Sequence, residues 1–137
     1  MNAERHPRIP REMIDLASGT TWSGLEGYPG LDVMLLGDTL DEGRRTGART
    51  RLVRFRPGAR THERLVHAYW EETLLVSGSL ETPEAAGESA PVGEHLGADP
   101  MPGEVLRYSL RPPGTPHGPF FSPRGCLLFE VQYYLAD

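Results

Sequence analysis

The stretch RPPGTPHGPFF, residues 111–121, places a single histidine in an unusually stiff piece of backbone. Four prolines and two glycines surround His117. Each proline restricts φ, and Gly114 permits a tight turn, so the direction of the imidazole is set before any ligand arrives. Fixing a ligand in advance lowers the entropy cost of ordering it around an ion. The stretch therefore makes His117 a candidate metal ligand.

A second candidate site begins at His67, which is followed by AYWEE. Glu71 lies four residues and Glu72 five residues further on, across what we expect to be a tight corner into a strand. An imidazole and a carboxylate from adjoining strand ends can converge on one ion, which builds a metal site without a helix. Corner geometry leaves both glutamates open as the carboxylate ligand.

The three remaining histidines are weaker candidates. His6 lies in a polar terminus and His95 in an acidic segment, where a solvated side chain is expected. His62 lies near a predicted strand end, and a histidine in a strand is more often hydrogen-bonded structure than a ligand. On a regular strand its side chain would face away from that of His67, so only a bulge or loop would bring the two together.

Short apolar runs separated by turn residues must position these side chains. The chain has 16 glycines and 13 prolines, which lie between short apolar runs, and this spacing predicts an all-β fold. No convincing helical period is present; the nearest window is 11–17. The predicted strands are residues 30–36, 48–56, 61–67, 72–80, 103–110, 116–121 and 125–134. The acidic segment 81–100 is expected to be a long surface loop with one short strand near 92–96.

The segment EETLLVSGSL predicts that both faces of its strand are covered. Leu74 and Val76 alternate with Thr73, Leu75 and Ser77, so apolar side chains occupy both faces. A small barrel has one interior, so the second cover must come from a neighbouring segment or from another copy of the chain. We expect a homodimer formed through strand faces or edges.

Length and composition narrow the function classes. A chain of 137 residues is expected to form one domain, residues 1–137, with a single core. Acidic residues outnumber basic ones 19 to 14 and the arginines are dispersed, which argues against nucleic-acid binding. The apolar runs are too short to span a bilayer, and the N-terminal stretch lacks a signal-peptide core, so we expect a cytoplasmic protein without a membrane partner. Cys126, the single cysteine, is expected to be a buried inert thiol.

Two motifs in this chain resemble those of the cupins. The usual first cupin motif is a glycine, two histidines one residue apart, a glutamate three or four residues later and a closing glycine. In PGARTHERLVHAYWEETLLVSG the matching residues are Gly58, His67, Glu71 and Gly78. The second motif, a proline, a glycine two residues on and a histidine three further, is matched by Pro112, Gly114 and His117. The chain is similar to a small single-domain cupin, and the resemblance, with core motifs in 58–121, implies a jelly-roll (double-stranded β-helix) barrel.

The chain most resembles the cupin modules of zinc-binding anti-sigma factors and of small dioxygenases that cleave diketones or hydroxyacetophenones. This resemblance implies a divalent metal. The position of the first motif histidine is occupied by Leu65. Two ligand sets therefore remain open: His67, Glu71 and His117, or these three with His62 as a fourth. The three-residue set of two histidines and one carboxylate suits non-haem Fe(II) and leaves positions for substrate and O₂. Zn(II), Mn(II) and Ni(II) are the alternative metals.

Side chains near these ligands predict the wall of a small-molecule pocket. The candidates are Leu65, Tyr69, Trp70 and Phe121. On the last predicted strand, Glu130 and Gln132 could point into the barrel or into solvent. The resemblance implies a dioxygenase-type enzyme that chelates a small diketone or hydroxy-ketone substrate.

Two other functions remain open on the sequence. One is a non-oxidative isomerase, cyclase or lyase, in which the metal acts as a Lewis acid and Glu71 or another carboxylate is the catalytic group that moves protons. The other is a sensor or binding module that holds a metal or small ligand without turnover, because a fold does not fix a function.

Overall fold

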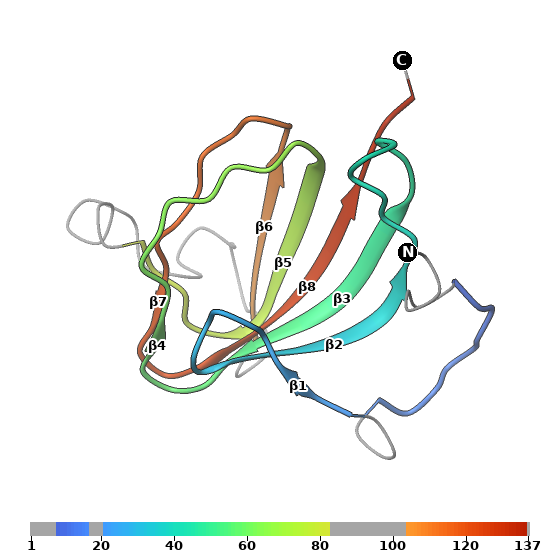
Figure 1. Ribbon diagram of the computed structural model, residues 1–137. Helices are drawn as coiled ribbons and strands as arrows, with labels where there is room; N and C mark the ends of the chain where they lie inside the picture. Colours follow the sequence, from blue (N-terminus) through green and yellow to red (C-terminus); the bar gives the residue numbers. More distant parts are fainter. Residues whose placement is uncertain (1–7, 17–20, 83–103, 137) are drawn as a thin grey trace.

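The structure is a computed structural model that describes residues 8–16, 21–82 and 104–136 (Figure 1). The described part of the chain contains strands and no helix, and hence no helix long and apolar enough to cross a membrane. The strands are β1 (Ser23–Gly24), β2 (Leu31–Asp38), β3 (Ala48–Phe55), β4 (Ala59–Arg60), β5 (Trp70–Gly78), β6 (Glu104–Arg111), β7 (Phe121–Ser122) and β8 (Cys126–Tyr133). The predicted all-β class is confirmed.

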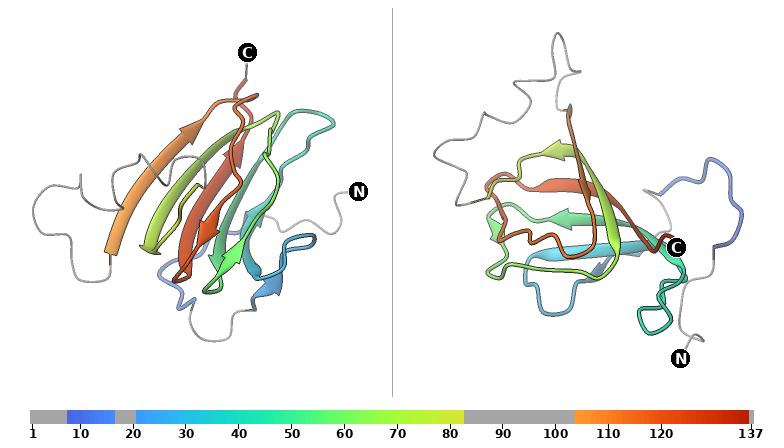
Figure 2. Two further views of the ribbon diagram at one scale, coloured as in Figure 1. Left: turned by 90° about the vertical axis from the view of Figure 1, so that its left-hand side faces the viewer. Right: turned by 90° about the horizontal axis from the view of Figure 1, so that it is seen from above.

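One curved sheet forms most of the barrel wall. Six strands pair in the order β1-β2-β3-β8-β5-β6, all antiparallel, and β4 pairs with β7 in a second, two-stranded sheet. The small sheet and the segments 61–69 and 112–120 lie across the concave side of the large one (Figure 2). The barrel interior is therefore bounded by the large sheet on one side and by these segments on the other.

Most of the predicted strands are present, and two are wrong. Five of the predicted ranges correspond to β2, β3, β5, β6 and β8, with ends shifted by one or two residues. The ranges 61–67 and 116–121 are not continuous strands: Leu65 and His117 form a single bridge, and β7 begins only at Phe121. Pro116 and Pro119 have no N–H to donate, so a regular ladder cannot continue through this segment. Apart from residues 81–82, the predicted loop at 81–100, with its short strand at 92–96, lies outside the described residues.

The inward-facing side chains change from apolar to polar along the strands. Alternate residues of a strand face the same side, so the pairing register stacks them in layers across neighbouring strands. Three successive layers across β3, β8 and β5 are Val53–Leu128–Leu75, Arg51–Glu130–Thr73 and Arg49–Gln132–Glu71. One end of the interior is thus hydrophobic core, and the other carries charged and polar groups.

The buried core lies at the apolar end of these layers. Its fully buried members are Leu31, Val53, Phe55, Leu75, Cys126 and Leu128. Burial raises the pKa of the Cys126 thiol, which agrees with the expected inert cysteine. Gly78, which closes the first motif, has a φ of 90°, and a Cβ there would lie 2.0 Å from the Gly125 carbonyl oxygen. Only glycine allows β5 to pass this close to the turn before β8.

The outer face of β5 is only partly covered. Glu71, Thr73 and Leu75 face inward and are buried, whereas Leu74 and Val76 face outward and are half-buried. Across the outer face, Leu74 pairs with Phe129 on β8 and with Tyr108 on β6. The homodimer therefore stays a prediction, and the incomplete cover of this outer face is the reason for it.

Candidate metal centre

Main-chain hydrogen bonds hold the two histidine-bearing segments together. Leu65 and His117 exchange N–H···O bonds of 2.7 and 2.9 Å, and the Gly114 amide donates to the His67 carbonyl at 2.8 Å. Gly114 makes this turn with a φ of 82°, a conformation that glycine adopts without steric cost. The proline-rich stretch therefore brings His117 opposite His67, although the two are far apart in the sequence.

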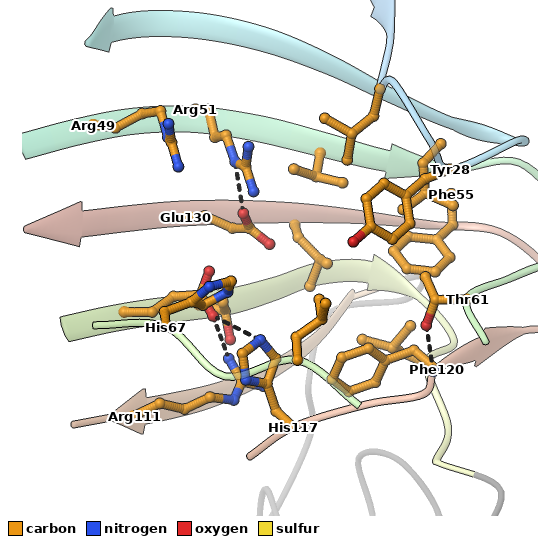
Figure 3. A pocket seen from close by; sticks show the side chains of 18 of the residues that line it. Tyr28, Arg49, Arg51, Phe55, Thr61, His67, Arg111, His117, Phe120 and Glu130 are labelled. Carbon is orange, nitrogen blue, oxygen red and sulfur yellow. Dashed lines mark hydrogen bonds and ion pairs between the residues drawn. The ribbon is translucent and has the colours of Figure 1, made fainter. Parts of the chain in front are cut away.

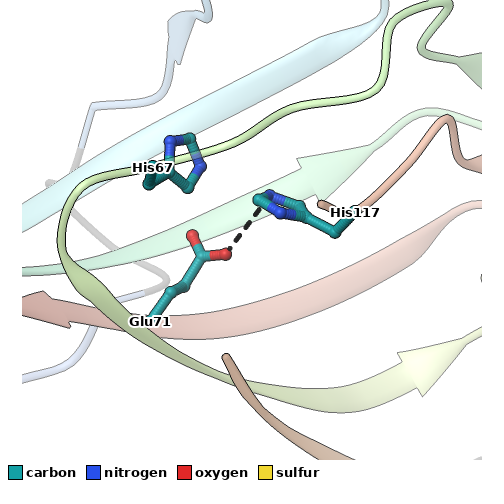
Figure 4. A group of neighbouring side chains, drawn as sticks. All are labelled: His67, Glu71 and His117. Carbon is teal, nitrogen blue, oxygen red and sulfur yellow. Dashed lines mark ion pairs between the residues drawn. The ribbon is translucent and has the colours of Figure 1, made fainter. Parts of the chain in front are cut away.

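Three side chains converge at the polar end of the barrel. His67, Glu71 and His117 point toward one another, and one ligand atom from each lies within 4.8 Å of the others (Figure 4). His117 Nε2 lies 3.5 Å from Glu71 Oε1, and the two imidazole centroids are 4.8 Å apart. The side chains of His117 and Glu71 are 9% and 5% exposed, so the group is shielded from bulk water.

Burial keeps both imidazoles in the form that binds a metal. Desolvation lowers the pKa of His67 and of His117, and the charge of Glu71 acts in the opposite direction on both. The Nδ1 of His117 lies 3.3 Å from the carbonyl oxygen of Thr115, to which it donates. This contact leaves the Nε2 lone pair of His117 directed at the centre of the group.

The carboxylate of Glu71 is held from two sides. Arg111 Nη1 donates to Oε1 at 3.1 Å, and Gln132 Nε2 donates to Oε2 at 2.6 Å. Gln132 in turn accepts a hydrogen bond from Arg49 Nε at 2.6 Å. A carboxylate has about four lone-pair positions, so Glu71 keeps capacity for a cation beside these two donors. Two neutral imidazoles and an oriented carboxylate fit a divalent metal.

A buried ion pair occupies the neighbouring layer. Arg51 Nε donates to Glu130 Oε1 at 2.8 Å, and both side chains are largely shielded from solvent. Burial raises the pKa of the Glu130 carboxyl, and the charge of Arg51 opposes that shift. The pair places a carboxyl group and a guanidinium inside the barrel, one layer below Glu71.

A cavity of about 220 Å³ connects the polar and apolar ends of the interior. Its polar end is lined by Arg49, Arg51, Glu130, Glu71, His67, Arg111 and His117, and its other end by residues that include Tyr28, Phe55, Thr61 and Phe120 (Figure 3). Tyr69, stacked on His67 with centroids 4.7 Å apart, also lines it, and burial raises the pKa of this phenol to about 12. A ligand here would meet charge at one end and hydrocarbon at the other.

Two of the four residues predicted for the pocket wall lie on the cavity. Leu65 and Tyr69 line the cavity, whereas Trp70 and Phe121 do not. Trp70 stacks on Tyr133 on the outer face of the sheet, and Phe121 lies against the guanidinium of Arg60 at 4.2 Å. In extended backbone, successive side chains point to opposite sides, so Tyr69 faces inward and Trp70 outward.

The other candidate ligands lie apart from the group of three. His62 is exposed, and its neighbour Thr61 is the residue whose side chain faces the cavity. Glu72 points outward and accepts hydrogen bonds from the hydroxyls of Tyr108 and Tyr133, which lower its pKa. The structure thus brings together the three-residue set with Glu71 and separates His62 and Glu72 from it.

The arginines of the site were not predicted from the sequence, and the direction of Gln132 was left open. Arg49 and Arg51 lie on the same face of β3 as Val53 and Phe55, which point into the core. The alternation along the strand could have predicted this, because an arginine two or four residues from a core residue of a strand points to the same side. Arg111 ends β6, directly opposite Glu71 in the register of the sheet.

Comparisons with known proteins identify the architecture. No protein-family model and no curated protein matches the chain. Similar solved structures include an RmlC-like cupin from Shewanella frigidimarina, at 17% identity and a TM-score of 0.58, covering 93% of this chain and 95% of that one. An acetylacetone dioxygenase from Acinetobacter johnsonii matches at 18% identity and 0.58, covering 94% of this chain and 80% of that one. The polyketide cyclase RemF from Streptomyces resistomycificus matches at 17% and 0.60, with 90% and 80% covered.

These similarities extend over nearly the whole chain, and at sequence identities of 17–18% they show the fold alone. They agree with the two motifs and with the antiparallel barrel described above. The chain has the cupin fold.

Proposed function

We propose that this chain is a metal-dependent enzyme of the dioxygenase type that acts on a small diketone or hydroxy-ketone. The observation that carries the proposal is the convergence of His67, Glu71 and His117 on the wall of the cavity inside the barrel. Two histidines and one carboxylate are the ligand set of many non-haem Fe(II) sites. The acetylacetone dioxygenase, whose name gives a diketone as its substrate, has a similar fold and supports the same choice.

A divalent metal in this site would polarise the oxygens of a chelated substrate and, as Fe(II), supply the redox chemistry that reaction with O₂ requires. The residues of the chain supply the setting. His67 and His117, held neutral by burial, present lone pairs, and Arg111 and Gln132 fix the direction of the Glu71 carboxylate. The apolar half of the cavity would hold the carbon skeleton and exclude water from the reacting end.

A non-oxidative reaction, an isomerisation, cyclisation or lyase step, is the second candidate. It is favoured by Glu130, a buried carboxyl in the cavity wall whose pKa is raised. A buried carboxyl in the wall of a cavity is a candidate for moving protons to and from a bound ligand. The cyclase RemF has a similar fold.

The test begins with metal analysis of protein purified without chelators, followed by anaerobic loading with Fe(II). O₂ uptake is then measured against a panel of small diketones and hydroxy-ketones. His117→Ala should lose both metal and O₂ uptake, and the exposed His62→Ala is the matched control that should keep both. Conversion without O₂ uptake would favour the second candidate, and retention of metal without any conversion would favour a sensor or binding module.

A further inference from the structure

We propose that the substrate carries a carboxylate, and that Arg51 inside the barrel receives it while the apolar part of the molecule lies against the hydrophobic layers. This inference rests on the proposed function for its chemical purpose, because it names the substrate class of that site. The carboxylate site itself is formed by residues that are not candidate metal ligands.

Arg51 has hydrogen-bond donors that Glu130 does not use. Its guanidinium meets Glu130 through Nε, at 2.8 Å, and no other hydrogen bond joins it to a described residue. The two terminal nitrogens, Nη1 and Nη2, therefore remain as donors in the wall of the cavity. A planar guanidinium presents these donors in the fork geometry that matches a carboxylate. A neutral ligand that displaced water from this end would leave charged donors unpaired.

The charge of the cavity wall also favours an anion. Arg49, Arg51 and Arg111 line the cavity together with two carboxylates, Glu71 and Glu130. Asp38, which is not part of the wall, lies 3.8 Å from Arg49 and brings the sum to zero. A divalent cation at the ligand group would then leave two positive charges in a shielded site. An anionic substrate offsets that excess, whereas a neutral one does not.

The cavity is divided into a charged half and an apolar half. Arg51 lies in the layer between Val53 and Arg49, at the boundary where apolar side chains give way to charged ones. On the far side of that boundary are Phe55, Tyr28 and Phe120. A small acid with a short branched or aromatic hydrocarbon part satisfies both halves at once.

The probes that test this inference are 4-methylpentanoate and 4-methylpentanamide, which share a shape and differ in charge. Their affinities for the full-length protein are measured by calorimetry, first without metal and then with Zn(II). The acid should bind about 10- to 100-fold more tightly than the amide, the range that hydrogen bonds to a charged group provide. An amide that binds as well as the acid would overturn the proposal without any variant.

Variants assign the preference to Arg51. Arg51→Met alone would strand the buried carboxylate of Glu130, so the test variant is the double substitution Arg51→Met/Glu130→Met, which replaces the ion pair by hydrocarbon. The acid-to-amide ratio should fall to about one in this variant. Arg54→Met is the matched control, because Arg54 lies on the same strand but pairs on the outer face with Asp32 at 3.0 Å. A ratio that persists in the double variant, or that falls equally in the control, would overturn the assignment.

Should the double variant fail to fold, as judged by near-ultraviolet circular dichroism, Arg51→Lys replaces it. A single ammonium cannot serve both Glu130 and the ligand with the geometry of the guanidinium fork, so the acid-to-amide ratio should fall at least severalfold. An unchanged ratio in this variant would contradict the proposal. Zn(II) retention after dialysis, measured on the same samples, separates the two hypotheses. Loss of Zn(II) from the wild type with an intact acid preference would refute the metal-dependent function and leave the carboxylate site standing.

Discussion

Substitution of Gln132 by leucine tests whether the metal centre depends on the polar layer behind it. Gln132 is 1% exposed, donates to Glu71 Oε2 and accepts from Arg49 Nε, with both hydrogen bonds at 2.6 Å. Leucine has a similar volume and removes both bonds at once. Glu71 then loses one of the two donors that fix its carboxylate, and Arg49 loses the acceptor for its Nε.

The expected cost follows from these two contacts. A hydrogen bond to a charged group contributes about 1.5–3 kcal/mol, so the loss of two sets an upper bound of roughly 3–6 kcal/mol. Water in the adjoining cavity can replace part of the bonding of Glu71, so we expect the free energy of unfolding to fall by about 2–4 kcal/mol. Residues that orient a metal ligand typically change metal affinity by about 10- to 100-fold, so Zn(II) affinity should fall by that factor.

Urea unfolding of the metal-free protein measures the first quantity, and competition with a chromophoric chelator measures the second. Tyr133→Phe is the matched control on the same strand, since it removes a single hydrogen bond to Glu72 on the outer face. The control should lose less stability and keep its Zn(II) affinity. If Gln132→Leu weakened Zn(II) binding no more than Tyr133→Phe, the polar layer would not position Glu71 and the reasoning would be refuted.

Three further predictions concern the histidines and the outer face of the sheet. His67→Ala should lose Zn(II) on dialysis while His62→Ala retains it, as measured by elemental analysis; equal loss in both would return His62 to the ligand set. The metal-free protein should keep its stability above the unfolded-state histidine pKa of 6.5 and lose it as the pH falls below that value, because the folded pKa of His67 and of His117 is lowered and the unfolded chain binds more protons. Urea midpoints from neutral pH to about pH 5 check this, and a His67→Ala/His117→Ala variant with the same slope would contradict it. The homodimer predicts a dimeric mass by light scattering at micromolar concentration and a monomeric mass for Leu74→Lys, which places a charge on the outer face; a monomeric wild type would refute it.

The sequence by itself determined the class of fold and indicated the candidate ligands, among which it left His62 and the choice between Glu71 and Glu72 open. Prolines around His117 stiffen a local stretch of backbone and Gly114 permits its turn. The spacing from His67 to Glu71 is short, so both features can be read from neighbouring residues. Five strands were predicted within one or two residues, since their alternation and their flanking turn residues are also local. The range 116–121 failed because its apolar residues resemble a strand, although Pro116 and Pro119 lack the N–H groups of a ladder. The range 61–67 failed with it, since that segment is its bridge partner through Leu65 and His117.

The tertiary structure alone decided which side of each strand faces the cavity and which residues meet across it. Period-two alternation divides β8 into two sets, but both sets contain apolar residues, so the sequence could not choose where Glu130 and Gln132 point. The pairing of β8 with β3 and β5 settled this, because it placed Gln132 between Arg49 and Glu71. Such contacts join strands that are distant in the chain, and their register depends on the packing of the whole sheet. No short stretch of sequence encodes that register, and the polar half of the cavity exists only once the barrel has closed.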